Sequence, residues 1–503
     1  MNTIDTVFAQ PVIGLLRQLP NANDIYLVGG SVRDAFLGRT VKDLDFACKE
    51  GIQTGRELAN RNGMDFFILD RERDCCRVIQ TLEDGSKLHF DINGLRAPTI
   101  ENDLQDRDLT INALAINIVT QKLNDPTGGL QDIRNKILRA CSESSIRNDP
   151  LRALRVIRFS VIFGFRIDPS LVSQIRAQIL DIANISNERI RDEFFKLLNC
   201  SKPATAIDLM EKLGLLGEIF PELNGLKGLE QPKPHVYDAW THTLSVVRHL
   251  SNILEAASKY DEENANADLF TGMLVLKLGN YRKQLVQHFS SERSDGRDRR
   301  ANLLFTALFH DVEKPTCKTN EDGRIRFLGH DAAGALTMQR LATELRLSTD
   351  EKGSQAAIVA NHMWIHGLVN RMDDGVKVSE RAIYRYYRSL GLDGIDLVFL
   401  SLADLRATYE HTLTQQKWRN ALDVSEQLLD AWYNRKEQVI SPPVLVNGHT
   451  LMKELGLQPG KILGKLIESV REDQAAGKIK TLDEALAHCR EKYAELRAKD
   501  IQN

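Results

Sequence analysis

The sequence of 503 residues lacks any apolar run near the roughly 18 residues that a membrane-spanning helix requires. Its first residues do not combine a charged start with an apolar core, so no secretory signal is expected. The seven cysteines are scattered without a C-x-x-C pair, which argues against a disulfide framework and against a zinc site. Together these absences predict a cytoplasmic protein with no membrane association.

A strong net charge is also missing, since the formal net charge is −3. This excludes wholesale binding of a polyanion, so any contact with RNA must come from local basic patches. One such patch runs from 134 to 166, where eight basic residues are set against Glu143 and Asp149. The eight are Arg134, Lys136, Arg139, Arg147, Arg152, Arg155, Arg158 and Arg166. The alternative interpretation is a solvated helix face.

The sequence changes its pattern near residue 138. Before this point strand-like and helix-like pieces alternate, and afterwards helical spacing dominates. The predicted strands are 26–28, 44–47, 65–69, 78–81, 88–92 and 115–118. The pattern predicts an α+β fold in which a mixed sheet precedes several helical parts. We expect four domains, with boundaries at 1–138, 139–230, 235–438 and 439–503.

Local signals mark several element ends. Pro150 and Pro169 each suit the first position of a helix, and 187–198 reads as a further helix. Two polar, charged stretches at 261–267 and 290–300 are predicted to be loops or an insertion. Near the end, the segment Thr481-Leu482-Asp483-Glu484 predicts a capping box at a helix start.

The most informative segment is Leu27-Val28-Gly29-Gly30-Ser31, which is followed by Asp43-Leu44-Asp45. It predicts a strand, a glycine turn, a helix and a second strand that carries two carboxylates. Glycine lets the backbone approach a triphosphate closely, and N–H groups at a helix start face phosphates. Residues two apart on a strand share a face, so Asp43 and Asp45 can hold Mg²⁺ ions side by side. This arrangement is typical of nucleotidyl transfer.

Further candidates follow along the first part of the chain. Asp91 lies in a strand-like alternation and could be a third carboxylate facing the pair, although an exposed strand residue is the alternative. In a charged cluster, Arg107 could bind phosphate, and Asp108 or Asn112 could contact ribose. That cluster could instead be a capped helix start.

Asp149 and Arg152 are three residues apart on a predicted helix and so share a face. A carboxylate beside a guanidinium can accept from the exocyclic amino group of cytosine or adenine and donate to the neighbouring ring nitrogen. Uracil and guanine place a carbonyl where the carboxylate lies and would be rejected. A simple surface ion pair between the two side chains is the alternative.

These motifs, in their order along the chain, resemble those of the class II tRNA nucleotidyltransferase and bacterial poly(A) polymerase family. The matching segments are 27–45, 107–114, 149–159 and 188–193. The resemblance implies a polymerase-β-like nucleotidyltransferase head at 1–138, a neck at 139–230 that reads the nucleobase, and helical parts that hold RNA. It implies that Asp43 and Asp45 bind the catalytic metals, with Mg²⁺ as cofactor, and that Asp149 and Arg152 template CTP and ATP. Arg33 and Asp34 match the signature of the family's head. Together with the candidates argued above, Asp91 is predicted to be a third catalytic carboxylate, and the predicted nucleotide-binding residues are Gly29, Gly30, Arg33, Asp34, Arg107, Asp108, Asn112, Asp149, Arg152, Arg155 and Arg158.

The sequence departs from this family pattern at two positions. The family usually has two arginines before the aspartate of the second motif, and here the first is Asp106. The neck motif usually begins with Glu-Asp, and here it begins with Asn148-Asp149. Asp149 and Arg152, the pair that would template the base, are present despite both departures.

A second set of candidates lies in the helical part at 235–438, where an adjacent His-Asp closes an apolar helix. Histidine together with carboxylate suits a divalent metal. The surrounding segments resemble the HD phosphohydrolase superfamily. The resemblance implies one metal held by His242, His310, Asp311 and Asp404, with His330 and His362 able to add a second. The metal, Mg²⁺, Mn²⁺ or Ni²⁺, would activate water against a phosphate ester. Glu313 stands where this superfamily usually has glycine, and an inactive domain kept as an RNA scaffold is the alternative.

We therefore expect an enzyme that adds CMP and AMP from CTP and ATP to the 3′ end of tRNA. A poly(A) polymerase, or an enzyme that adds only CC or only A, would share the same motifs. Two alternatives from other classes remain open, a phosphohydrolase with a vestigial transferase and a non-catalytic RNA-binding protein. The oligomeric state is not predicted by the sequence.

Overall fold

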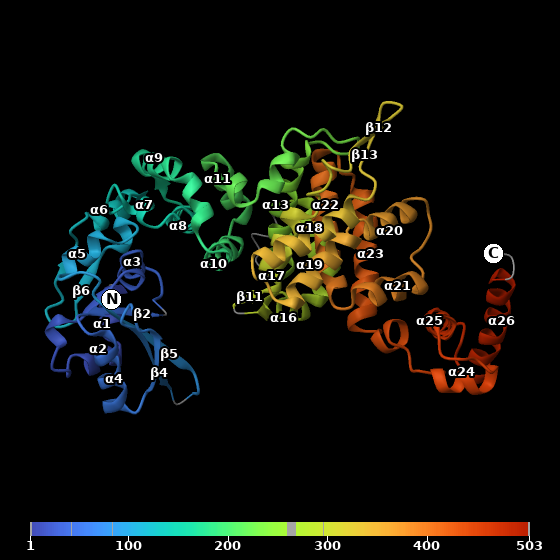
Figure 1. Cartoon of the computed structure of the whole chain (residues 1–503), viewed down its shortest axis with the longest axis horizontal. Helices are drawn as coiled ribbons and strands as arrows, with labels where there is room; N and C mark the ends of the chain where they lie inside the picture. Colours follow the sequence, from blue (N-terminus) through green and yellow to red (C-terminus); the bar gives the residue numbers. More distant parts are fainter. Residues whose placement is uncertain (1–2, 42, 83, 259–267, 295, 501–503) are drawn as a thin grey trace. The chain divides into compact units, whose positions relative to one another are not determined.

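The computed structural model describes residues 3–41, 43–82, 84–258, 268–294 and 296–500, and it contains two compact units (Figure 1). The first unit spans Met1–Ile219 and the second spans Phe220–Asn503. The predicted polar stretch at 261–267 lies outside the described residues. The α+β fold class is confirmed, because a mixed sheet in the first unit is followed by helices through the rest of the chain.

The first unit contains a seven-stranded sheet with the order β3-β4-β5-β2-β1-β6-β7. Its strands are β1 (Tyr26–Val28), β2 (Leu44–Cys48), β3 (Asp65–Asp70), β4 (Cys75–Thr81), β5 (Lys87–Gly94), β6 (Ala115–Asn117) and β7 (Leu123–Asn124). Strands β2 and β5 are parallel, and the other neighbours are antiparallel. All six predicted strands are present. The two-residue strand β7 was missed because so short a piece carries no alternation.

Helices surround this sheet and continue beyond it in the first unit. They are α1 (Thr3–Phe8), α2 (Pro11–Leu16), α3 (Gly30–Phe36), α4 (Gly51–Asn62), α5 (Ile100–Gln105), α6 (Gly129–Asn135), α7 (Ser145–Asn148), α8 (Arg152–Phe163), α9 (Pro169–Ala177), α10 (Asn187–Leu198), α11 (Pro203–Leu213) and α12 (Leu215–Ile219). A short parallel pair, β8 (Ile137–Leu138) and β9 (Arg166–Ile167), joins the two ends of the α8 segment.

The predicted start at Pro169 and the predicted helix at 187–198 are confirmed. The predicted start at Pro150 is wrong by two residues, since α8 begins at Arg152. The reason is a tight turn, in which the Arg152 N–H donates to the Asp149 carbonyl at 3.0 Å and the Ala153 N–H donates to the Pro150 carbonyl at 3.0 Å. These i→i+3 bonds tighten the entry before the α-helical ladder begins.

The second unit is built from helices α13 to α26. They are α13 (Ala239–Ser258), α15 (Leu269–Leu278), α16 (Arg282–Ser290), α17 (Arg299–Phe309), α18 (His330–Glu344), α19 (Thr349–Asn361), α20 (Trp364–Asp373), α21 (Glu380–Leu390), α22 (Asp393–Tyr409), α23 (Gln415–Tyr433), α24 (Gly448–Leu455), α25 (Lys461–Ala475) and α26 (Leu482–Asp500). Helices α17 and α22 are buried almost all round, which explains their continuous apolar sequences.

Two hairpins interrupt these helices and were not predicted. They are β10 (Glu292–Ser294) with β11 (Arg297–Asp298), and β12 (Thr319–Glu321) with β13 (Arg324–Arg326). The described part of the stretch at 290–300 is therefore a hairpin that runs into α17, where a loop or insertion was expected. Its strands are too short and too polar to give a period-2 signal.

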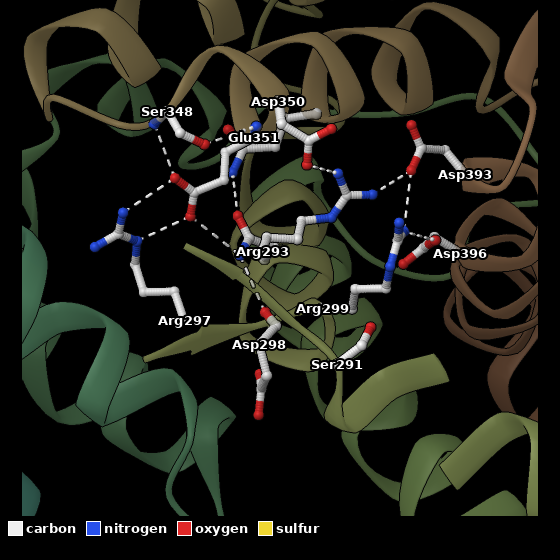
Figure 2. A network of polar contacts seen from close by, with 12 residues as sticks. Ser291, Arg293, Arg297, Asp298, Arg299, Ser348, Asp350, Glu351, Asp393 and Asp396 are labelled. Atoms are coloured by element: carbon white, nitrogen blue, oxygen red, sulfur yellow. Dashed lines mark hydrogen bonds and ion pairs between the residues drawn. The ribbon is translucent and has the colours of Figure 1, made fainter. Parts of the chain in front are cut away.

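A buried charge network ties the β10–β11 hairpin to three helices (Figure 2). Arg297 donates to both carboxylate oxygens of Glu351 at 2.8 and 3.1 Å. Arg293 pairs with Asp393, and Arg299 donates to Asp396 at 3.0 Å. Because Arg299, Glu351 and Asp393 lie in the first turns of α17, α19 and α22, the network joins the beginnings of these helices. His310 and His362, described below, directly follow α17 and α19, and Asp404 lies in the later part of α22.

The end of the chain forms a small helical cluster around Leu451, Leu466 and Val470. The predicted capping box is confirmed at the start of α26, where the Glu484 N–H donates to Thr481 Oγ1 and the Thr481 N–H donates to the Glu484 carboxylate. No helix among the described residues is long and apolar enough to cross a membrane. The seven cysteines all lie in the described part of the chain and form no disulfide there.

Candidate functional sites

The glycine turn between β1 and α3 has a backbone that only glycine adopts without strain. Gly29 has φ 64° and ψ −125°, and a Cβ atom there would lie 3.0 Å from Nη1 of Arg107. A Cβ atom on Gly30 would lie 3.8 Å from a carboxylate oxygen of Asp45. The turn therefore lies directly beside the candidate metal ligands, as the sequence predicted.

Ser31 connects this turn to the carboxylate strand. Its hydroxyl donates to the Asp43 carbonyl at 3.0 Å and accepts from the Asp45 N–H at 2.9 Å. The side chain is buried, so the two bonds hold the start of β2 against α3 without competition from water. Sequence reasoning missed this residue, although a small hydroxyl residue directly after a Gly-Gly turn was the available signal.

Three carboxylates approach one another across β2 and β5. Asp45 and Asp91 are directly opposite in the parallel register, whereas Asp43 lies in the bend just before β2, outside the strand on which it was expected, with its charge still acting on Asp45. Burial, then Asp91 and Asp43, raise the pKa of Asp45 to about 6. Asp91 is half-buried, which disfavours the interpretation as an exposed strand residue. Carboxylate oxygens are ligands that divalent cations prefer, so the donor set fits such a cation.

Arg77 on β4 is a further residue of this cluster that the sequence did not reveal. Its Nε and Nη2 donate to the two carboxylate oxygens of Asp91 at 2.7 and 2.8 Å. The pairing arises because Arg77 and Asp91 are partners in the antiparallel register of β4 and β5. This bidentate contact fixes the orientation of the Asp91 carboxylate beside Asp45.

A cavity of about 1060 Å³ opens next to the glycine turn within the first unit. It brings together ten of the predicted residues, which are Gly29, Gly30, Arg33, Asp45, Arg107, Asp108, Asn112, Asp149, Arg152 and Arg155. Asp34, Asp43, Asp91 and Arg158 are not among its lining residues. Four basic residues that were not predicted also line it, namely Arg73, Arg96, Arg189 and Lys196. Its size and polarity suit a nucleotide.

Arg33 joins the glycine turn to the following helical part. Its Nη1 donates to Asn112 Oδ1 at 2.5 Å and its Nε donates to Asp34 at 2.9 Å. The guanidinium also lies over the rings of Phe159 and Phe163, at 5.0 and 4.8 Å from their centroids. It is thus held rigidly at the wall of the cavity.

The charged cluster around Asp108 forms a 3₁₀ turn, Thr110–Asn112, so the interpretation as a capped α-helix start is wrong. Asp108 accepts from Arg155 Nε at 2.8 Å and from Asn112 Nδ2 at 3.0 Å. Burial alone would raise the pKa of Asp108, but Arg155 and these hydrogen bonds lower it overall. Arg107 pairs with Asp103 at 3.0 Å.

Asp149 and Arg152 both line the cavity, but each side chain forms hydrogen bonds with different partners. Nη1 of Arg152 donates to the carbonyl of Arg107 at 3.3 Å, and Nη2 donates to that of Asp106 at 3.0 Å. Asp149 accepts from Nη2 of Arg189 at 2.7 Å. The contact considered as an alternative, a surface ion pair between Asp149 and Arg152, is not the one the structure makes.

The second unit places all six predicted metal ligands together, and each side chain is buried. They form two groups, one of His242, His310 and Asp404 and one of Asp311, His330 and His362. Asp311 also approaches the first group, with Oδ2 3.2 Å from His310 Nε2. Asp311 Oδ2 also lies 3.6 Å from His242 Nε2, in the group where Asp311 was expected, while its Oδ1 faces His330 of the second group at 3.4 Å, so Asp311 contacts both groups.

Hydrogen bonds to the main chain set the histidine tautomers in these groups. Nδ1 of His310, His330 and His362 lies 2.7–2.8 Å from the carbonyls of Ala307, Phe327 and Val359, so each Nδ1 donates. Each Nε2 therefore presents a lone pair when the ring is neutral.

Those lone pairs converge on one another. Nε2 of His330 lies 3.1 Å from Nε2 of His362 and 3.4 Å from Oδ1 of Asp311. Among the described residues, His310 Nε2 is a buried atom without a hydrogen-bond partner, whereas Oδ2 of Asp311 lies 2.6 Å from the Lys314 ammonium. Neutral imidazole nitrogens and carboxylate oxygens that meet in this way fit divalent cations.

The charges around the two groups keep the carboxylates ionised. Burial opposes ionisation of Asp311, but His310 and Lys314 hold its pKa well below the usual value. Burial likewise opposes ionisation of Asp404, and His366 and His242 lower its pKa in the same way. His366 Nε2 lies 2.8 Å from Asp404 Oδ2 and was not predicted. Ionised carboxylates are the form that binds metal.

A cavity of about 420 Å³ opens onto these groups within the second unit. Lys314, Arg326 and Lys417 contribute positive charge to its lining, while Phe327, Leu328, Met363 and Tyr409 contribute apolar surface. Glu313 is not part of the lining, because its carboxylate accepts from Thr337 at 2.5 Å. The replacement of glycine at this position therefore does not fill the cavity.

Comparisons with protein families match three parts of the chain. Residues 25–139 match a family model described as Poly A polymerase head domain. Residues 164–226 match one described as probable RNA and SrmB-binding site of polymerase A. Residues 406–489 match one described as tRNA nucleotidyltransferase domain 2, putative.

Curated proteins similar to the chain over most of its length include two bacterial enzymes. The A-adding tRNA nucleotidyltransferase of Deinococcus radiodurans is 31% identical over 92% of this chain and 94% of its own. The CC-adding tRNA nucleotidyltransferase of Thermus thermophilus is 30% identical over 92% of each chain. A multifunctional CCA protein of Actinobacillus pleuropneumoniae is 29% identical over 68% of this chain and 76% of its own.

Solved structures share the fold. A CCA-adding enzyme in complex with CTP superposes with a TM-score of 0.62 and 20% identity, over 97% of both chains. The Thermotoga maritima CCA-adding enzyme complexed with tRNA superposes with a TM-score of 0.59 and 18% identity, over 97% of this chain and 98% of its own.

Proposed function

The chain belongs to the tRNA nucleotidyltransferase family, and we propose that it adds CMP and AMP from CTP and ATP to the 3′ end of tRNA, which builds or repairs the CCA terminus. The observation that carries the proposal is the single cavity in which the glycine turn, Asp45 and Asp149 meet. It provides a place for the triphosphate, for the reacting centre and for the nucleobase.

In the proposed reaction the terminal ribose hydroxyl of the RNA attacks the α-phosphorus of the bound nucleotide. A P–O bond to the new nucleotide forms, the bond between the α-phosphorus and the bridging oxygen breaks, and pyrophosphate leaves. The backbone of Gly29 and Gly30 allows the triphosphate to approach closely. Arg33 and Arg107, which line the same cavity, stabilise the negative charge of the departing pyrophosphate.

The carboxylates beside the turn organise the reacting centre. Asp43 and Asp45 would hold Mg²⁺, which when bound neutralises phosphate charge and makes the attacking hydroxyl more acidic. Ser31 fixes the main chain at both carboxylates. Arg77 donates to both carboxylate oxygens of Asp91 and so fixes its orientation. The charge of Asp91 raises the pKa of Asp45.

The nucleobase is read at the start of α8. A carboxylate at Asp149 accepts a hydrogen bond from the amino group of cytosine or adenine, and Arg152 donates to the ring. Both residues line the cavity, Asp149 just before α8 and Arg152 at its first position, and Arg155 of the same helix donates to Asp108 at 2.8 Å. We propose that Asp108 and Asn112 contact the ribose, and that Arg158 supports the neck through Glu193, to which it donates at 2.5 Å.

The extent of addition is decided by an incorporation assay. Transcripts of tRNA that end before CCA, after C and after CC are incubated with labelled CTP, ATP or both. Addition of C, C and then A, with a stop after A, is the expected result. Addition of only CC or only A, the activities named for the Thermus and Deinococcus relatives, would restrict the function to one step. Long A tails on unrelated RNA would contradict the proposal.

We further propose four functional parts within the chain. Residues 1–138 carry the transfer chemistry, 139–230 read the base and contact RNA, 235–438 hold the second metal site, and 439–503 contact RNA. Seven cysteines without a disulfide among the described residues are compatible with a reducing compartment, and we propose the cytoplasm.

A second activity is favoured by one observation, the convergence of buried nitrogen and oxygen lone pairs beneath a cationic cavity. We propose that the second unit is a metal-dependent phosphohydrolase. His242, His310 and Asp404 would hold one divalent ion, and Asp311, His330 and His362 a second. Bound ions would lower the pKa of water, whose oxygen forms the new bond to phosphorus while the ester P–O bond breaks. Lys314 and Lys417 would hold the phosphate.

The hydrolase proposal is tested on the full chain with a nucleoside monophosphate and a cyclic phosphate as substrates. Phosphate or ring-opened product should appear with Mn²⁺, Ni²⁺ or Mg²⁺ and should disappear in Asp311→Asn. Retention of both metals without turnover on either substrate would instead indicate a scaffold.

A further inference from the structure

The carboxylate of Asp149 is held by a residue from another helix. Nη2 of Arg189, on α10, donates to Oδ2 of Asp149 at 2.7 Å, although the two residues are 40 positions apart. The other oxygen, Oδ1, accepts from the Leu151 N–H at 3.3 Å. Each carboxylate oxygen therefore has its own donor, so the plane of the carboxylate is defined before any nucleotide binds.

Arg152 does not share this task. Its Nη1 donates to Ser145 Oγ at 3.0 Å as well as to main-chain carbonyls, and its Nη2 donates to the Asp106 carbonyl. These contacts fix the Arg152 guanidinium against the segment before α8, independently of Asp149. The two halves of the proposed base reader are thus anchored separately.

Arg189 lies on the wall of the same cavity. It shares one face of α10 with Glu193 and Lys196, which also line the cavity. Glu193 is in turn bound by Arg158 of α8 at 2.5 Å. Helix α10 is therefore fastened to α8 through Glu193 and to the segment just before α8 through Asp149, the carboxylate that meets the base.

We infer that Arg189 is a positioning residue for nucleobase selection, which holds the Asp149 carboxylate in the orientation that accepts the amino group of cytosine or adenine. The inference rests on the proposed use of CTP and ATP. Arg189 reads no base itself. It acts by fixing the direction of the Asp149 carboxylate, so that the carbonyls of uracil and guanine meet an acceptor and are repelled.

The inference predicts a change in selectivity. In Arg189→Met the carboxylate can rotate, and kcat/KM for CTP relative to UTP, and for ATP relative to GTP, should fall on the order of tenfold. Arg189→Lys, which can still donate to Oδ2, should retain most of the selectivity. The matched control is Arg176→Met, an exposed arginine of α9 in the same unit that does not line the cavity. It should leave both ratios unchanged.

A double-mutant cycle shows whether Arg189 acts through Asp149. If it does, Asp149→Asn combined with Arg189→Met should lose no more selectivity than Asp149→Asn alone. Equal loss of rate with all four nucleotides in Arg189→Met, without a change in the ratios, would mean a merely structural role and would overturn the inference. So would additive effects in the cycle.

Binding measurements separate this inference from the proposed function. Dissociation constants of CTP, UTP, ATP and GTP are measured on the full chain by calorimetry without tRNA. If the wild-type protein binds CTP and ATP preferentially but transfers neither to tRNA, the proposed function is contradicted. The inference about Arg189 is then still tested by the dissociation constants of Arg189→Met. A wild-type protein that transfers both, with selectivity unchanged in Arg189→Met, contradicts the inference alone. A wild-type protein without any base preference overturns both.

Discussion

Asp45 and Asp91 lie directly opposite each other on the parallel strands β2 and β5, and burial together with this neighbour raises the pKa of Asp45 to about 6. The pairing of β2 with β5 places two carboxylates next to each other, and these carboxylates repel. The negative charge of Asp91 disfavours ionisation of Asp45, and a divalent cation would relieve the repulsion. This contact therefore leads to predictions about the pH dependence of stability, the effect of Mg²⁺ on stability and the activity of an Asp45 variant.

The first prediction concerns Asp45 and pH. Because the folded-state pKa is above the unfolded one, the metal-free protein binds an extra proton when folded, and stability declines as pH rises from about 4 through about 6. A shift from 3.8 to about 6 corresponds to at most about 3 kcal/mol. Thermal unfolding with a chelator at pH 5 and pH 8 measures the decline, and Mg²⁺ should reduce it.

Asp45→Asn should therefore be inactive and yet more stable than wild type at pH 8 without metal. The amide removes the buried charge and keeps the shape of the side chain. Asp65→Asn on the exposed start of β3 is the control and should alter neither property. A less stable Asp45→Asn protein at pH 8 would contradict the electrostatic explanation.

Ser31 provides the second prediction. Ser31→Ala removes a buried hydroxyl that bonds both Asp43 and Asp45, so the Asp45 N–H loses a partner. We expect a loss of about 1–3 kcal/mol in the free energy of unfolding and a larger relative fall in kcat than in nucleotide affinity. Denaturant titration and steady-state kinetics measure the two effects. Unchanged kcat would show that the hydroxyl does not position the carboxylates.

The third prediction concerns the buried pair of Arg297 and Glu351 (Figure 2). Removal of one partner leaves the other charge buried, so Arg297→Met should destabilise the second unit by about 3–5 kcal/mol. The double variant Arg297→Met with Glu351→Leu should recover much of that loss, because neither charge remains. Chemical denaturation measures both. A double variant no more stable than Arg297→Met would argue against this account.

The fourth prediction is a metal count. The full chain should bind two divalent ions in the second unit, and His362→Ala should lower that number because it removes one ligand from the group around Asp311. Elemental analysis after dialysis against Mn²⁺ measures the stoichiometry, in a background of Asp43→Asn with Asp45→Asn to exclude ions of the first unit. His411→Ala, outside both groups, is the control. An unchanged count in His362→Ala would contradict the assignment.

Periodicity and motif order were sufficient for much of the fold. The strands at 26–28 and 44–47, the helix at 187–198 and the capping box at Thr481 were predicted because each depends on neighbours within a few residues. Hairpins such as β10–β11 were missed, since their residues are polar and their stability comes from charges on distant helices.

Sequence alone determined the chemical groups present, which are the glycine turn, the paired carboxylates, the Asp149 and Arg152 pair and the set of histidines. Tertiary structure decided their partners. It placed Arg77 on Asp91, Arg189 on Asp149, and each oxygen of Asp311 toward a different group of histidines. The physical reason is that residue type and local spacing fix which interactions are possible, whereas strand register and helix packing fix which atoms come within hydrogen-bonding distance.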